Sequence, residues 1–169
     1  MLCIFCDERG PRAKEDIIPN WLAEELGGVP PILTTHFANV TGEESRKFTQ
    51  THQTLATLKF PEVCVNCNGG WMSRMESLTK AHLIPMIHGE RTVLSPSVQR
   101  QIAAWVQLKG ISLDAYYAIQ YRVVRHLPAF VAHTFGQQFQ PLPTATVDLG
   151  WFEAFEEGAM VPFASVLSR

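Results

Sequence analysis

Two pairs of cysteines carry the clearest chemical signal in this chain. All four cysteines lie in two C-x-x-C pairs, Cys3/Cys6 and Cys64/Cys67. Two such pairs supply four thiolates, and four soft ligands in a tetrahedron are what Zn²⁺ prefers at structural sites. The start of the chain has no signal-peptide layout, so we expect a reducing cytosol, where paired cysteines bind metal. The spacing predicts one closed Zn(Cys)4 site that holds the fold; two unrelated reduced pairs or a redox dithiol are the alternatives.

The residues around the cysteine pairs extend this signal into a longer pattern. The first pair is followed by "KEDIIPNWL" (Lys14–Leu22), and the second opens "CVNCNGGWM" (Cys64–Met72). This order resembles the zinc-knuckle HNH endonucleases, which carry the ββα-metal nuclease motif. The resemblance covers about residues 1–90. The matching positions are Cys3, Cys6, Lys14, Glu15, Pro19, Trp21, Leu22, Cys64, Cys67, Asn68, Gly70, Trp71 and Met72.

The resemblance implies a division of roles at a metal-dependent site. In that family a divalent metal holds the scissile phosphate and stabilises the developing charge, while a histidine removes a proton from water. Mapped onto this sequence, the acid beside the histidine position is Glu15, and the residue after the second knuckle is Asn68. Both are therefore expected metal ligands, and their oxygens suit a hard ion such as Mg²⁺ or Mn²⁺.

Asp16 stands at the position of the general-base histidine, which is the main departure from the family pattern. An unperturbed aspartate has a pKa near ~3.9, against ~6.5 for histidine, so it is the weaker base. Beside Glu15 and a metal it is better suited to be a ligand. Three interpretations stay open: an impaired or silent nuclease, an altered acidic site that uses Asp16, or a deliberate inactivating change.

Other polar residues could contribute to such a site. His36 and His52 fall in a predicted hairpin and could reach the site across it, although a surface position is the simpler interpretation. Glu76 lies eight residues after Asn68, roughly 12 Å along a helix axis, so we expect it to be structural or to support a ligand. Arg12 and Lys14 are the candidates for phosphate contacts, which fix position without reading bases; a solvated surface is the alternative.

Local patterns predict the elements that must position these residues in the first half of the chain. A β-prone stretch covers residues 14–19, and Pro19 can open a short helix that ends at Gly27. A hairpin is expected over residues 32–60. After the second cysteine pair a helix begins, with Trp71, Met75 and Leu78 on one face, and it is expected to stop near Pro85.

The second half reads as mainly helical. Ser95 is a plausible N-cap with Pro96 in the first turn, and a shorter helix is expected around residues 128–134. The segments 146–155 and 161–167 read as strands, paired across a turn at residues 156–158. The expected buried stripe of the long helix consists of Val98, Ile102, Trp105, Val106 and Leu113.

The bulk composition limits the partners. The chain has 169 residues, 46% of them hydrophobic, a net charge of −2 and a pI of about 6.3. It can bury a real core, but it has no large basic field, so nucleic acid would need a local patch or a metal. No apolar run reaches the ~18 residues that a membrane span requires.

These observations predict an α+β fold: a treble-clef-like ββα-metal core with a structural zinc over residues 1–90, and a mainly helical extension ending in short strands over residues 91–169. The expected function is an HNH-type endonuclease that hydrolyses phosphodiester bonds in DNA, with RNA not excluded, impaired because Asp16 replaces the histidine. The alternative is a catalytically silent zinc module that binds nucleic acid or a protein. A toxin or effector fragment is a third possibility.

Overall fold

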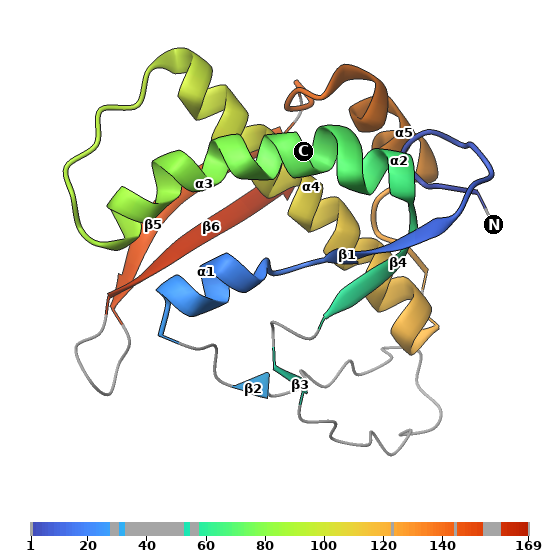
Figure 1. Cartoon of the computed structure of the whole chain (residues 1–169), viewed down its shortest axis with the longest axis horizontal. Helices are drawn as coiled ribbons and strands as arrows, with labels where there is room; N and C mark the ends of the chain where they lie inside the picture. Colours follow the sequence, from blue (N-terminus) through green and yellow to red (C-terminus); the bar gives the residue numbers. More distant parts are fainter. Residues whose placement is uncertain are drawn as a thin grey trace.

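A two-stranded antiparallel sheet and the helical segment that follows its second strand form the frame of the N-terminal half (Figure 1). The computed structural model describes residues 2–27, 31–32, 53–54, 58–122, 124–143, 145–153 and 160–168. Strand β1 (Arg12–Asp16) pairs with β4 (Lys59–Cys64). Strand β4 then runs directly into α2 (Val65–Cys67), the irregular turn η2 (Asn68–Met72) and α3 (Ser73–Ile87). The chain is therefore mixed α and β, as predicted.

The β1–β4 pairing contains a bulge at the position of Lys14. Ala13 pairs with Val63, and Glu15 pairs with Phe60, so two residues of β4 oppose Lys14. Such bulges bend a strand and re-aim its side chains. After the bulge Glu15 is buried at 6% exposure. The Glu15 carboxylate of β1 therefore points into the interior, whereas Lys14 on the same strand stays exposed.

The short helix α1 (Asn20–Glu25) follows β1 as the proline and glycine signals predict. Pro19 is its N-cap in extended conformation, a position where the missing proline N–H costs nothing. Gly27 has a φ of +74°, a left-handed conformation that favours glycine just past a helix end. Inside the helix Trp21 is buried, with its ring 6.0 Å from that of Trp105.

The long helix α4 (Pro96–Tyr121) confirms the prediction made from its cap and its apolar stripe. The Ser95 hydroxyl accepts a hydrogen bond from the Val98 N–H at 3.4 Å, and Pro96 lies in the first turn. Of the predicted stripe, Ile102, Trp105 and Val106 are buried, whereas Val98 and Leu113 are half-buried. Gly110 lies inside the helix without breaking it. The shorter helix α5 (Ala129–Gln138) is also confirmed.

Helix α3 differs from its prediction in two respects. It includes Pro85 and continues to Ile87, at the cost of the one backbone hydrogen bond that the missing proline N–H would have donated to the carbonyl four residues earlier. Leu78 was expected on the buried face but is 57% exposed. The residues of α3 that are buried are Met75 and Thr79, so the inward face is rotated from the predicted one.

The C-terminal strands form a hairpin of their own. Strand β5 (Ala145–Glu153) pairs antiparallel with β6 (Met160–Ser168) in continuous register, which confirms the predicted pairing, and both strands contact α4. The predicted hairpin over residues 32–60, with His36 and His52, lies largely outside the described residues. In that region the structure describes β2 (Pro31–Ile32), β3 (Gln53–Thr54) and the start of β4.

Buried side chains from both halves of the chain contribute to one hydrophobic core. Phe5, Phe60 and Met72 come from the first half, and Leu108 and Phe135 from the second. The division into two domains near residue 90 stays a prediction; the segment in question links α3 to α4. Within the described ranges, no helix combines the length and the apolar character that crossing a bilayer requires.

Candidate metal centre and the acidic residues beside it

The four cysteines converge on one point, although two of them are about sixty positions from the others. Their sulfur atoms all lie within 4.8 Å of one another, and the Sγ atoms of Cys6 and Cys64 are 3.7 Å apart. A tetrahedral Zn²⁺ with Zn–S bonds of about 2.3 Å separates its sulfurs by about 3.8 Å. The cluster therefore fits one tetrahedral ion, and the prediction that these cysteines can share a metal is confirmed.

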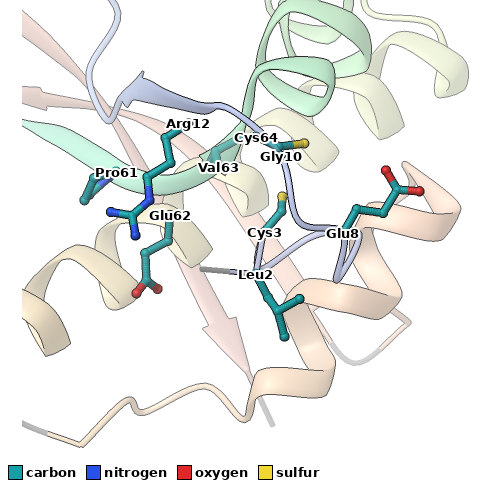
Figure 2. A pocket seen from close by; sticks show the side chains of 9 residues that line it. All are labelled: Leu2, Cys3, Glu8, Gly10, Arg12, Pro61, Glu62, Val63 and Cys64. Atoms are coloured by element: carbon teal, nitrogen blue, oxygen red, sulfur yellow. The ribbon is translucent and has the colours of Figure 1, made fainter.

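The first knuckle is a tight loop at the N-terminus. The Cys3 N–H donates to the Glu8 carbonyl at 3.1 Å, and the Asp7 N–H donates to the Cys3 carbonyl at 2.9 Å. Asp7 has a φ of +56°, a left-handed conformation that aspartate adopts more readily than most residues. The loop is tied to β4 because the Ile4 N–H donates to the Glu62 carbonyl. In Figure 2 the Cys3 side chain points from this loop toward the end of β4, where Cys64 lies.

The second knuckle forms where β4 becomes a helix. Cys64 is the N-cap of α2, and its Sγ accepts a hydrogen bond from the Cys67 N–H at 3.3 Å. The Trp71 side chain hydrogen-bonds Cys67; because an indole can only donate, its Nε1–H points to the sulfur. Helix N-termini and N–H donors stabilise thiolates. The Cys67 N–H and the Trp71 indole thus donate to the two sulfurs of this knuckle.

Burial and hydrogen bonds act on the thiols in opposite directions. Burial raises the pKa of Cys6 to about 11 and also raises the pKa of Cys67. For Cys3, burial works to raise the pKa, but backbone N–H donors from Cys64, Phe5 and Cys6 outweigh it, and the pKa is lowered. Four crowded sulfurs cannot all be thiolates without a cation among them. The donor set and this crowding are what a structural Zn²⁺ requires.

Aromatic rings and α5 close over the metal centre. Trp71 lies 5.5 Å from Phe5 of the first knuckle and 4.8 Å from Phe139, measured between ring centroids. A Cβ added to Gly136 of α5 would lie 2.9 Å from the Cβ of Phe5 and closer still to the Phe5 carbonyl. Only glycine allows this approach. The C-terminal part of the chain therefore packs directly against the zinc loop.

Glu15 is held by a lysine that the sequence analysis did not single out. The Lys109 ammonium on α4 forms an ion pair with Glu15 Oε1 and donates to the Asp16 main-chain carbonyl at 2.8 Å. It also contacts Glu76 Oε2 at 3.1 Å. Burial raises the pKa of Glu15; Lys109 lowers it, and the charges of Glu76 and Asp16 raise it again. The expected metal ligand thus already has a cationic partner.

Asp16 forms an ion pair across the β1–β4 sheet. Its carboxylate forms an ion pair with Lys59, the residue directly opposite on β4. The side chains of Lys59 and Asp16 are 44% and 30% exposed. Water therefore screens this pair, and a group that competes for Asp16 meets little resistance.

The remaining predicted site residues lie on the surface or partly on it. Asn68 follows Cys67 at the start of η2 and is half-buried, and among the described residues no hydrogen bond of its side chain is found. Arg12 and Lys14 are exposed on β1. Figure 2 shows the side chains of Arg12 and Glu62 on the same side of the β1–β4 sheet. The Glu62 carboxylate forms an ion pair with Arg125. The catalytic and nucleic-acid roles of these residues stay predictions.

A signal for Lys109 was present in the sequence. On α4 it lies three residues after Val106 and four before Leu113, so it continues the predicted buried stripe. A lysine at such a position is rarely buried unless an anion lies against it. The sequence does not say which acid that is, because Glu15 is 94 positions away.

Comparison of the chain with protein-family models, curated proteins and solved structures finds no match.

Proposed function

We propose that the chain is an HNH-type endonuclease that hydrolyses phosphodiester bonds in DNA, with a structural Zn²⁺ and a separate divalent ion. The observation that carries this proposal is the convergence of the four cysteines. An ion bound by all four would fasten the N-terminal loop to the junction of β4 and α2, so that "KEDIIPNWL" and "CVNCNGGWM" belong to one strand–strand–helix unit. Strand β1 contacts η2, which supports a site shared by Glu15, Asp16 and Asn68.

The roles proposed for the residues follow from their environments. A bound Mg²⁺ or Mn²⁺ would polarise the scissile phosphate and stabilise the leaving oxygen. Asn68 offers an amide oxygen to such an ion, and Asp16 offers a carboxylate that is only loosely held by Lys59. Glu15 can join them through its second oxygen while Lys109 keeps the first. The weak basicity of Asp16 makes proton removal from water the step expected to limit the rate.

A second function is favoured by the two ion pairs of β1. Because Lys109 holds Glu15 and Lys59 holds Asp16, both acids are neutralised by the protein itself. A zinc module that binds nucleic acid or a protein without cutting would need no more than this. The two functions differ in whether the frame supports cleavage once a stronger base is supplied.

Asp16→His tests the nuclease proposal. Zinc per chain and the melting temperature are measured first, and plasmid cleavage is then followed with Mg²⁺ or Mn²⁺. We expect Asp16→His to raise cleavage well above that of the unmodified chain, and Glu15→Ala in the same background to lower it. A folded, zinc-loaded Asp16→His protein that leaves the plasmid intact would overturn the nuclease proposal and support the binding module.

A further inference from the structure

The Lys109 ammonium lies at the meeting point of three oxygen atoms from two elements. Glu15 Oε1 and the Asp16 carbonyl come from the end of β1, and Glu76 Oε2 comes from α3. An ammonium has three N–H donors and no acceptor. Each donor therefore has an oxygen to receive it, and the Lys109 side chain is fully satisfied although it starts on a third element, α4.

Lys109 and Glu15 are so deeply buried that neither charge could remain without the other. The side chains of Lys109 and Glu15 are 10% and 7% exposed, and the ammonium also lies 5.8 Å from the centre of the Trp105 ring. Removing a charge from water is costly, and only good geometry with satisfied hydrogen bonds compensates for it. Two carboxylates face one ammonium, so the cluster keeps an excess of negative charge.

The donor set is the one that hard cations use. Two carboxylates and a main-chain carbonyl are typical ligands of divalent ions that bind oxygen. Here they are fixed by a strand and a helix rather than by mobile loops. The cluster is more than a group of acids, because it already holds a cation, and that cation is part of the chain.

We infer that Glu15, Glu76 and the Asp16 carbonyl form an internal cation site whose resident cation is the Lys109 ammonium, in place of a divalent ion. As long as Lys109 is present, these three oxygens take no free metal, whereas the second carboxylate oxygen of Glu15 stays open to the ion of the proposed function. Removing the ammonium, while keeping the three oxygens, opens the site to a hard divalent ion. The inference concerns which cation the oxygens hold, and it does not depend on the chain being a nuclease.

The test uses Mn²⁺ as the probe on the full-length, zinc-loaded protein. Mn²⁺ prefers oxygen ligands and competes poorly for thiolates, so it leaves the cysteine site undisturbed. Free Mn²⁺ is counted by electron paramagnetic resonance for the unmodified chain, Lys109→Ala and Lys109→Met. Lys80→Ala is the matched control, because Lys80 lies on α3 with its ammonium 5.6 Å from the Trp21 ring and outside this cluster.

We expect both Lys109 variants to bind one Mn²⁺ more than the unmodified chain and Lys80→Ala. Adding Glu76→Gln to Lys109→Ala should weaken that binding by about 10–100-fold, and adding Glu15→Gln should abolish it. The melting temperature of the Lys109 variants should rise with Mn²⁺ concentration, since a ligand that binds the folded state stabilises it.

Three results would overturn the inference. One is Mn²⁺ binding by the unmodified chain that Glu76→Gln removes, because Glu76 belongs to this cluster and not to the proposed catalytic site, so the oxygens would then hold a metal beside Lys109. Another is a folded Lys109 variant that binds no Mn²⁺. The third is failure of both variants to fold even with Mn²⁺ present. A nuclease that fails the Asp16→His test can still pass this one, so the two proposals fail separately.

Discussion

Burial of Glu15 depends on a single residue 94 positions away in the sequence. A carboxylate at 6% exposure would normally take up a proton, and the ammonium of Lys109 is what favours its charged form. Lys59 also forms an ion pair with a β1 carboxylate, that of Asp16, but at the surface. Lys109 and Lys59 both pair with a carboxylate of β1, but only Lys109 is buried. Substituting each lysine should therefore lower the stability of the fold by different amounts.

Lys109→Met should destabilise the fold in a pH-dependent manner. Burial raises the pKa of Glu15 above its ordinary value near 4.5; the folded state then binds the proton more tightly, so stability falls as pH rises through this window. Without Lys109 the pKa rises further, and the loss at neutral pH grows. We expect a cost of about 3–5 kcal/mol at neutral pH and a smaller one in acid, measured by urea unfolding at both pH values.

Lys59→Ala is the surface counterpart. Its pair with Asp16 is screened by water, so we expect a cost of about 0–1 kcal/mol with little pH dependence. Equal costs for the two lysine variants would contradict the distinction between a buried and an exposed pair.

Residue types and spacing predicted the cysteine site but not the ion-pair cluster around Glu15. The cysteine site could be predicted because C-x-x-C spacing carries its own geometry. The cluster around Glu15 could not, since the contact between β1 and α4 arises from tertiary packing. The only local trace of it was a lysine on an apolar stripe.

At the scale of elements, the four-cysteine site joins the N-terminal loop to the junction of β4 and α2, beside the Ile4–Glu62 backbone hydrogen bond and the packing of Phe5. The N-terminal loop has little core of its own beyond Phe5, and α2 has three residues. Because α2 continues into η2 and α3, the N-terminal loop is the segment that depends most on the shared site. The metal is therefore expected to supply much of the free energy that holds the loop against β4 and α2.

Zinc removal should loosen this unit selectively. Structural zinc contributes about 10–16 kcal/mol in small zinc domains, and its binding requires deprotonated thiols, so chelation should succeed more readily as pH falls. We expect a chelator or Cys64→Ser to lower the melting temperature and to expose Trp71, which is followed by fluorescence. A chelator that removes the zinc while leaving both signals unchanged would show that the site is not structural.

Helix α5 should be equally sensitive where it meets the first knuckle. Gly136→Ala places a methyl group against the Phe5 backbone, which cannot move away as a flexible side chain could. We expect a loss of about 1–3 kcal/mol from this overpacking, together with faster zinc loss to a chelator. Gly69→Ala is the control, because a Cβ there meets nothing within 4 Å.

Elements were predictable where local signals dominate. The Ser95 cap, Pro19 and Gly27 mark helix ends through backbone chemistry that needs no tertiary partner. In α3 the predicted face is correct at Met75, which is buried, but it continues at Thr79, four residues later, rather than at Leu78. A spacing of three residues and one of four both fit a helical repeat, and only the tertiary contacts decide between them.

At the scale of the whole molecule, the charge distribution limits any contact with nucleic acid. A net charge of −2 gives no general attraction to a polyanion. Binding to DNA must then come from a few cations near the proposed site, and Arg12 and Lys14 are the exposed pair on the strand that carries Glu15 and Asp16. Glu62, on the same side as Arg12 in Figure 2, is already neutralised by Arg125. This arrangement leaves the arginine available to a phosphate.

The salt dependence of DNA binding tests this arrangement and follows from the proposed function. Each phosphate neutralised by a side chain contributes a slope of about −0.9 to the plot of log affinity against log salt concentration. Arg12→Gln with Lys14→Gln should therefore weaken binding at low salt and flatten the slope by about two units, measured by fluorescence anisotropy with a labelled duplex. Arg91→Gln with Arg100→Gln, two exposed arginines beyond α3, should leave the slope unchanged. If both double variants flattened the slope equally, DNA would bind without a fixed orientation, and the proposal that β1 faces the substrate would be wrong.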